Sequence, residues 1–301
     1  MLVLAVGLLG APSTAHAAPV PGTTCDVFPA NNIWNTDIST LPVNPNNARW
    51  MKAMHAGTTR LHPDFGRPPY GMPFVAVDDT TPTTPVAFQY DDESDPGPYP
   101  FTADTPIENG SDRHAFMINS DTCMLYELFN AKWNDGSPTA GSGAIFDLNS
   151  NALRPAGWTS ADAAGLPIFP GLVRYDEVEA GAIHHAIRFT VDCTSRQFLW
   201  PARHEAGEAN RNCPPMGARF RLKKSFDGRR FSPDARIVIN ALKHYGLIVA
   251  DNGSDWYFQG TEDGRWSDSL LDQLKTIPAS QFQAVSEGGC KVDIDSAESS
   301  C

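Results

Sequence analysis

Histidine and glutamate side chains recur among large apolar residues on the predicted strands of this chain. Two β-strands are expected at about residues 182–191 and 198–205, and successive side chains of a strand point to opposite faces of the sheet. His185 and His204 fall on the faces that carry the large apolar residues of these strands. Both histidines are therefore predicted to point inward, either as hydrogen-bonded core residues or as part of a site.

A second pair of predicted strands repeats this arrangement. Segments 113–119 and 123–130 flank a turn-forming Asn-Ser-Asp-Thr stretch, which predicts an antiparallel hairpin. His114 and Glu127 each lie on the apolar face of their strand, and Asp112 extends the face of His114. Burying an ionisable group is costly unless the group is paired, so we expect these side chains to converge with the two inward histidines.

Glycoside hydrolysis is the chemistry that this set of residues favours. In such enzymes two carboxyl groups flank the sugar bond, and the surroundings keep one of them protonated. Glu127 is the expected proton donor because its strand is apolar, and Asp112 is its expected partner. The histidines would tune the protonation of these acids and bind hydroxyl groups. Further carboxyl candidates are Glu205, Asp95 and Asp251.

Aromatic and charged side chains would complete a sugar-binding site, because flat rings can pack on sugars and polar groups can bind hydroxyls. The expected substrate-binding residues are Arg113, Arg188, Trp200, Trp158, Tyr99, Asp95, Asp251 and Trp256. The expected partner is an extracellular glycan, with no nucleic acid, no membrane insertion, no cofactor and no bound metal, and the chain is expected to act as a monomer.

Three alternatives to hydrolysis remain open. A polysaccharide lyase would use a histidine or tyrosine as base and Arg113, Arg188 or Arg203 to neutralise a uronate carboxylate. A non-catalytic glycan-binding or cell-envelope protein needs no catalytic group. Metal chemistry would draw on the three histidines 114, 185 and 204 together with Glu127, although all four ligands would then come from separate strands.

Other function classes have little support in the sequence. The chain has no GxSxG elbow, no HExxH, no P-loop and no GxGxxG that opens a helix. The formal net charge of −12 makes a nucleic-acid backbone a poor ligand. In 219–223, basic residues alternate with apolar ones, which predicts a strand with a solvated basic face; an anion site is the alternative.

The N-terminus and the cysteines indicate export. Residues 1–17 combine a short apolar run with an Ala-His-Ala cleavage pattern, as in a secretory signal peptide, and the run is too short to span a membrane. The six cysteines favour an oxidising compartment and up to three disulfides, of which Cys193–Cys213 and Cys290–Cys301 are the expected local pairs. We therefore expect a secreted, extracellular protein.

The predicted fold is mainly β, an antiparallel sandwich or jelly roll with two helices near the C-terminus, at 231–246 and 267–277. Residues 18–288 are expected to form one β-rich domain, and 289–301 a polar tail. Two stiff loops, 62–66 and 93–100, combine acidic and aromatic residues with proline and glycine, a composition often found around ligand sites.

Several stretches of the chain resemble a group of exported bacterial proteins of unassigned function. They are FPANNIWNTD (28–37), LHPDFG (61–66), ESDPGPYP (93–100), DRHAFMI (112–118), LYELFNA (125–131), WTSADAAGLPIFPGLVRYDE (158–177), HAIRFT (185–190), PPMGARFRLK (214–223) and ADNGSDWYFQG (250–260). The stretches cover most of the chain beyond residue 17. The resemblance implies no particular activity, but it favours His185 over His184 as part of the shared pattern.

Overall fold

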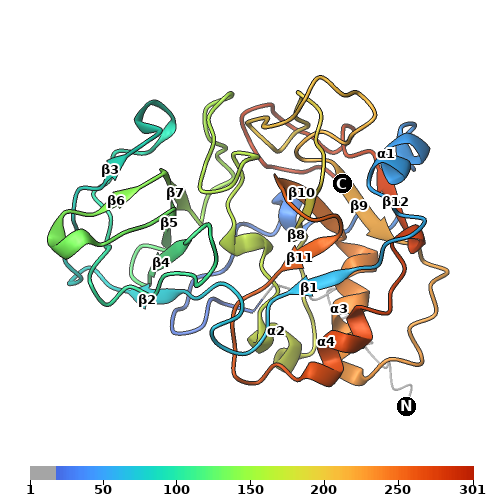
Figure 1. Cartoon of the computed structure of the whole chain (residues 1–301), viewed down its shortest axis with the longest axis horizontal. Coiled ribbons are helices and arrows are strands. Elements are labelled where there is room, and N and C mark those ends of the chain that lie inside the picture. The colour runs from blue at the N-terminus through green and yellow to red at the C-terminus, as the bar shows by residue number, and fades with distance from the viewer. Residues whose placement is uncertain (1–17) are drawn as a thin grey trace, which may run out of the picture.

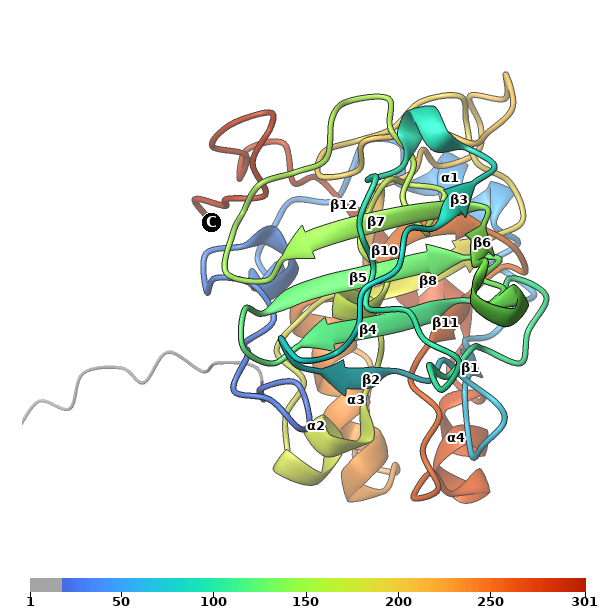
Figure 2. The same cartoon turned by 90° about the vertical axis from the view of Figure 1, so that its left-hand side faces the viewer.

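A computed structural model describes residues 18–301 of the chain, so the predicted signal peptide lies outside the described residues. Two β-sheets stand next to each other, a smaller one of four strands and a larger one of six (Figure 1). Turned by 90°, the four-stranded sheet lies in front and the six-stranded sheet behind it (Figure 2).

The larger sheet has the order β1-β11-β8-β10-β9-β12 and mixes parallel and antiparallel neighbours. Strand β8 lies at its centre, antiparallel to β11 on one side and parallel to β10 on the other. The strands are β1 (His62–Asp64), β8 (Ile187–Val191), β9 (Arg219–Leu222), β10 (Leu247–Asn252), β11 (Tyr257–Gln259) and β12 (Phe282–Val285).

The smaller sheet has the order β2-β4-β5-β7, and a separate pair joins β3 to β6. The predicted hairpin is confirmed as β4 and β5, with Phe116 opposite Glu127. The strands are β2 (Val75–Val77), β3 (Ala87–Phe88), β4 (Ala115–Asn119), β5 (Met124–Phe129), β6 (Thr139–Ala140) and β7 (Ser142–Asp147).

The expectation of a purely antiparallel sandwich or jelly roll is wrong. Four pairs of strands run parallel, namely β1 with β11, β8 with β10, β2 with β4, and β3 with β6. A parallel pair needs a long crossover between its strands, so its partners lie far apart in the sequence. The chain is a mixed α/β protein in which short strands dominate.

The two helices expected near the C-terminus are confirmed as α3 (Pro233–His244) and α4 (Asp268–Leu274). Ser232 and Ser267 cap them, since each hydroxyl oxygen accepts a hydrogen bond from a backbone N–H of the first turn. The shorter helices are α1 (Asn47–Ala53) and α2 (Tyr175–Ala180), and the 3-10 turns are η1 (Ile33–Asn35), η2 (Asp91–Glu93), η3 (Asn134–Gly136), η4 (Phe169–Gly171) and η5 (Ala279–Gln281).

Apolar side chains pack on both faces of the smaller sheet. The inward face, which carries Phe116 and Leu125, joins the main core together with the larger sheet and its helices. The outward face carries Met117 and Leu128 and is covered by Tyr99 and other residues of the segment before β4. The expected alternation of faces in this hairpin is therefore real, but neither face is left to solvent.

The basic strand β9 departs from its prediction. Arg219 is only 1% exposed, and its side chain lies 3.1 Å from Glu287 while its Nε donates to the carbonyl oxygen of Tyr245. Arg221 is buried as well and donates to the carbonyl oxygen of Ile38. The face expected to be solvated is thus internal, because Glu287 and the carbonyl oxygens of Tyr245 and Ile38 contact its arginines.

Three disulfides cross-link the described residues, and both predicted local pairs are among them. Cys193–Cys213 and Cys290–Cys301 close short loops, whereas Cys25–Cys123 joins the N-terminal segment to the start of β5. Disulfides persist in an oxidising compartment, which is consistent with the predicted export of the protein. Between residues 18 and 301, every helix is too short or too polar to cross a bilayer.

Candidate functional site

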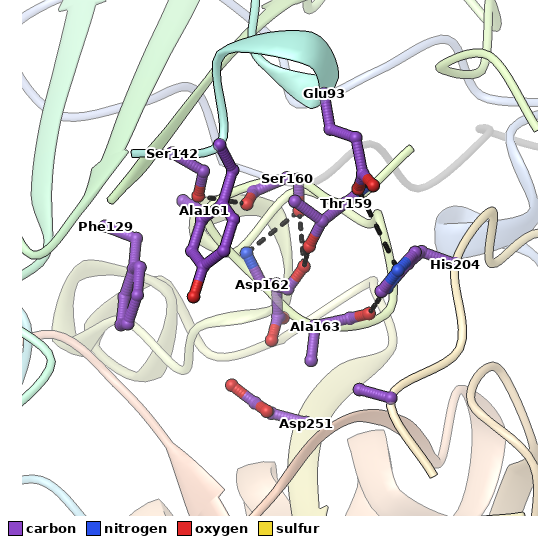
Figure 3. A pocket seen from close by; sticks show the side chains of 12 residues that line it. Glu93, Phe129, Ser142, Thr159, Ser160, Ala161, Asp162, Ala163, His204 and Asp251 are labelled. Atoms are coloured by element: carbon purple, nitrogen blue, oxygen red, sulfur yellow. Dashed lines mark hydrogen bonds and ion pairs between the residues drawn. The ribbon is translucent and has the colours of Figure 1, made fainter. Parts of the chain in front are cut away.

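Two cavities meet at one carboxyl group between the sheets. The Glu93 cavity, about 340 Å³, is lined by Tyr90, Glu93, Phe129, Ser142, Thr159, Ser160, Ala161, Asp162, Ala163, His204, Ala206 and Asp251 (Figure 3). The Gln259 cavity, about 260 Å³, is lined by Asp64, Met72, Glu108, Asp112, His114, Arg188, Thr190, Asp251, Asn252, Gly253, Ser254, Tyr257 and Gln259. Asp251 lines both.

A β-bulge in β10 gives Asp251 its direction. Val249 pairs with Phe189, but the next pair joins Asp251 to Thr190, so Ala250 is an extra residue in the ladder. Without it, Asp251 would stand on the face of Phe189, because side chains alternate along a strand. The bulge instead puts Asp251 on the face of Arg188 and Thr190, with its side chain 27% exposed.

The bulge is held by the loop that carries Asp162. The carbonyl oxygen of Ala250 accepts the N–H of Ala164 at 2.9 Å. The hydroxyl of Ser160 donates to the carbonyl oxygen of Leu166, and its oxygen accepts the N–H of Asp162, which fixes the loop internally. Gly165 closes the turn with a φ of +66°, and a Cβ there would lie 2.4 Å from the carbonyl oxygen of Trp158.

One arginine serves two aspartates at this point. Arg188 donates from Nε and Nη2 to the two oxygens of Asp162, at 3.0 and 2.8 Å, whereas Oδ2 of Asp251 lies 3.9 Å from Nη2. Burial and the neighbouring charge of Asp162 raise the pKa of Asp251 to about 7, against the opposing effect of Arg188. Asp162 is therefore the direct partner of the arginine, while Asp251 retains a proton up to near neutral pH.

A second carboxyl group lies at the other end of the Glu93 cavity (Figure 3). Oε2 of Glu93 accepts the N–H of Thr159 at 2.9 Å. Nδ1 of His204 donates to the carbonyl oxygen of Ala163 at 2.8 Å, which leaves Nε2 to face Glu93 at 3.9 Å. Glu93 comes from the 93–100 loop, so the prediction that this stiff loop lines a ligand site is consistent with its position.

His114 is buried at the wall between the two cavities. Its Nδ1 lies 2.7 Å from the carboxylate of Glu108, and its Nε2 lies 3.3 Å from the carbonyl oxygen of Ala161. Burial alone would lower the pKa of His114, but the hydrogen bond and charge of Glu108 outweigh it and raise that pKa. Both ring nitrogens face acceptors, which favours the protonated form of His114.

Glu127 is inward, as predicted, but it lines neither cavity. Its fully buried carboxyl group accepts the backbone N–H groups of Ile168 and Phe169, at the start of η4, at 2.8–2.9 Å. Burial raises its pKa to about 7, although these two hydrogen bonds lower it. Glu127 thus ties the smaller sheet to the 158–171 segment, and the structure gives it no access to a ligand.

His185 does not join the other predicted groups. It is fully buried, with Nε2 at 3.1 Å from Glu177 and Nδ1 at 2.7 Å from the carbonyl oxygen of Ala186. Arg174 donates to the other oxygen of Glu177 at 2.7 Å. The convergence of His185 with His114, His204 and Glu127 is therefore wrong, and residues 18–301 contain no group of three or more potential ligands placed to hold a metal ion.

The predicted aromatic residues lie mainly outside the two cavities. Trp256 is in the core and donates to the carbonyl oxygen of Met54, and Tyr99 is buried and donates to the carbonyl oxygen of Asp95. Trp200 donates to the carbonyl oxygen of Ser296, on the side of the C-terminal tail. Trp158 packs under the guanidinium of Arg154.

Of the remaining predicted residues, Arg188, Asp112 and Asp251 line a cavity. Asp95 instead pairs with Arg154 and accepts the N–H of Ile145, so it anchors its loop to β7. Arg113 donates to the carbonyl oxygen of Ala131. Asp95 and Arg113, which were predicted to bind substrate, therefore hold parts of the protein together.

Four cavity-lining acids were not predicted as catalytic groups, namely Asp64, Glu93, Glu108 and Asp162. Asp162 lies in the 159–165 stretch, which is an irregular loop. Glu93 belonged to a loop expected to line a site, but was not singled out, and Glu108 stands in an irregular segment before β4. For Glu93 and Glu108 the sequence signal is the density of acids beside proline and glycine, whereas Asp162 is the one acid of its stretch and has no such signal.

The geometry offers a proton donor and a second carboxylate that open into one cavity. Comparisons with known proteins add no precedent: no family model matches the chain, and neither the curated proteins nor the solved structures contain a significant match.

Proposed function

We propose that this protein is a secreted carbohydrate-active enzyme, a glycoside hydrolase that acts on an extracellular polysaccharide. The observation that carries the proposal is Asp251, a partly exposed carboxyl group whose pKa is raised to about 7 and which shares a cavity with Glu93. A pair of carboxyl groups with different protonation is what acid-assisted cleavage of a glycosidic bond requires. We further propose that the chain belongs to the group of exported bacterial proteins that it resembles.

In the proposed reaction Asp251 acts as the acid. It donates its proton to the glycosidic oxygen while the bond from that oxygen to the anomeric carbon breaks. A water molecule adds to the anomeric carbon from the side of Glu93, and its released proton passes to the Glu93 carboxylate. His204 stands beside Glu93, with its Nε2 at 3.9 Å from the Glu93 carboxyl group. The anomer formed, read by NMR, separates this single displacement from direct attack by Glu93.

Hydrolysis is favoured over a lyase by the state of the arginines. A lyase needs a cation free to neutralise the uronate carboxylate. Arg188 donates to both carboxyl oxygens of Asp162, and Arg203 donates to the carbonyl oxygens of Arg154 and Ile294. Arg113 is also engaged with a backbone carbonyl. Each arginine expected to bind a uronate thus already has a protein partner.

Incubation with a panel of polysaccharides tests the proposal, with reducing ends and ultraviolet absorbance read together. New reducing ends without new absorbance support a hydrolase, and absorbance from an unsaturated product would instead identify a lyase. Asp251→Asn and Glu93→Gln should each abolish most of the activity. Asp104→Asn, a change of the same kind at an exposed carboxyl outside both cavities, is the control. Binding without turnover by the wild-type protein would favour the non-catalytic glycan-binding alternative.

A further inference from the structure

The Gln259 cavity is rich in hydrogen-bond acceptors. Asp64, Asp112 and Asp251 bring carboxyl groups to its wall. Its cationic side chains are already engaged, since Arg188 binds Asp162 and His114 binds Glu108. A ligand that fits this cavity must therefore supply donors such as hydroxyl or amino groups, and an anionic ligand would meet repulsion.

Gln259 adds an acceptor that the protein leaves without a partner. The residue is 4% exposed, at the end of β11. Its Nε2 donates to the carbonyl oxygen of Tyr257 at 3.3 Å, but its buried Oε1 has no hydrogen-bond partner among residues 18–301. A buried acceptor without a partner destabilises the fold by roughly 1–3 kcal/mol, so such groups are rare unless a ligand or water uses them.

An aromatic wall stands beside these acceptors. The ring of Tyr257 lines the cavity and stacks on His62 at 4.0 Å between centroids with an interplanar angle of 15°, which fixes its orientation. Nearby, Tyr70 donates to Asp64 at 2.6 Å. A flat ring next to convergent acceptors suits a sugar, whose C–H face packs on the ring while its hydroxyls point to the edge.

The other cavity has an aromatic residue of its own. Tyr90 lines the Glu93 cavity and is 46% exposed. Asp251 is the residue that both cavities share, so the proposed proton donor stands between two chambers that each hold an aromatic ring and acidic groups. An enzyme that removes single terminal sugars closes the chamber on one side of the proton donor. Cleavage inside a chain needs room for sugars on both sides of the cleaved bond.

We propose that the Gln259 cavity is a sugar subsite on the far side of the cleaved bond, so that the protein cuts within the chain of a neutral or cationic glycan, such as a polymer of hexosamine. Tyr257 carries the sugar ring, and Gln259 accepts a hydroxyl or amino hydrogen. This inference rests on the proposed function, because it takes Asp251 as the point of cleavage.

Binding of hexasaccharides to the full chain carrying Asp251→Asn tests the subsite without turnover. The probes are the β-1,4-linked hexamers of glucosamine and of N-acetylglucosamine and the hexamer of galacturonate, measured by calorimetry. We expect one of the first two to bind and the galacturonate hexamer to bind at least about tenfold more weakly. Added on top of Asp251→Asn, Gln259→Leu and Tyr257→Leu should each weaken the best probe by about tenfold.

The choice of Gln259→Leu protects the test against misfolding. Leucine has a similar size and removes the unpartnered acceptor, so the melting temperature should stay the same or rise. Gln197→Leu makes the same chemical change at an exposed position outside both cavities and should leave binding unchanged.

The outcomes separate the subsite from the proposed reaction. Gln259→Leu and Tyr257→Leu could weaken binding while the wild-type protein releases no reducing ends from any polysaccharide. This outcome would support the sugar subsite and contradict the proposed hydrolase activity. Turnover with unchanged affinity in both variants, or release of monomers alone from the hexamers, would overturn the subsite. Failure of all three hexamers to bind at about 1 mM would overturn it as well.

Discussion

Two ionic clusters of similar composition lie on opposite faces of strand β8 and of the residues just before it. On one side, Arg174 binds Glu177 at 2.7 Å and lies 3.7 Å from Asp176, with His185 against Glu177. On the other, Arg188 binds Asp162 and lies 3.9 Å from Asp251. In each cluster one arginine serves a near and a far carboxyl group.

The clusters differ in where their acids can reach. Glu177 and His185 are fully buried, and Arg174 and His185 lower the pKa of Glu177 in spite of the opposing effect of burial. Asp251 opens into two cavities, and burial with a like-charged neighbour raises its pKa. The first arrangement holds a charge in place, whereas the second keeps a proton available. A buried ionic cluster is therefore no sign of a site unless one member opens into a cavity.

The largest expected effect on activity comes from neutralising Asp251, the proposed proton donor. Asp251→Asn should reduce kcat/KM by about 10²–10⁴-fold, because the leaving oxygen then receives no proton from the enzyme. The melting temperature should change little, since the substitution also removes the repulsion from Asp162. Steady-state kinetics and calorimetry of the same preparation check both parts, and an active variant would show that Asp251 is not the acid.

The matching change in the enclosed cluster should act on stability instead. Glu177→Gln removes the charge that Arg174 binds at 2.7 Å inside the core, which should lower the free energy of unfolding by about 3–5 kcal/mol. Urea unfolding measures this loss. A Glu177→Gln protein that stays as stable as the wild type would remove the distinction between the two clusters.

A subtler change should move the pH dependence of activity. Asp251 is active when protonated, so activity should fall as the pH rises through about 7. Asp162→Asn removes the like charge and frees Arg188 for Asp251, and both effects lower the pKa of Asp251. The alkaline limb of kcat/KM should then shift down by about one pH unit, and Asp104→Asn should leave it in place. An upward shift would contradict the assigned role of Asp162.

The smallest expected effect is on stability as a function of pH. Asp251, Glu127 and Glu287 have a pKa raised by burial to about 7, so the folded chain binds more protons than the unfolded chain between their ordinary pKa values and about 7. Stability should therefore rise as the pH falls from about 8 to 5.5, by a few °C in melting temperature.

The opposite sign applies at lower pH. Glu177 and Glu108 have a lowered pKa, so their contribution is present above their ordinary value of 4.5 and is lost as the pH falls through the folded-state pKa. Melting temperatures across the pH range check the resulting maximum, and Glu287→Gln should flatten its alkaline side. Stability that rises steadily from pH 5.5 to 8 would contradict these pKa shifts.

Local pattern was enough to predict much of the scaffold. The alternation in 113–130 placed His114 and Glu127 inward, the spacing of apolar residues located α3 and α4, and short spacing identified two disulfides. Each of these features depends on residues that are close in the sequence.

The site itself depends on contacts that the local pattern does not record. Period-two alternation cannot tell which strand lies beside β8, nor that Ala250 is an extra residue in β10, and one such residue reverses the face of Asp251. Asp162 reaches the site from an irregular loop with no periodicity. The catalytic residues were predicted on the apolar face of β8, the face that carries His185. The Gln259 cavity instead opens on the opposite face, which carries Arg188.

The hydrogen bond from Ala164 to Ala250 has one further consequence. It joins the loop of Asp162 to the bulge that directs Asp251, so neither can rearrange while this amide stays bonded. Its rate of exchange with deuterium should therefore report the intactness of the whole site through a single proton. A ligand that spans both cavities should slow that exchange, and a substitution that opens the loop should speed it before any loss of global stability.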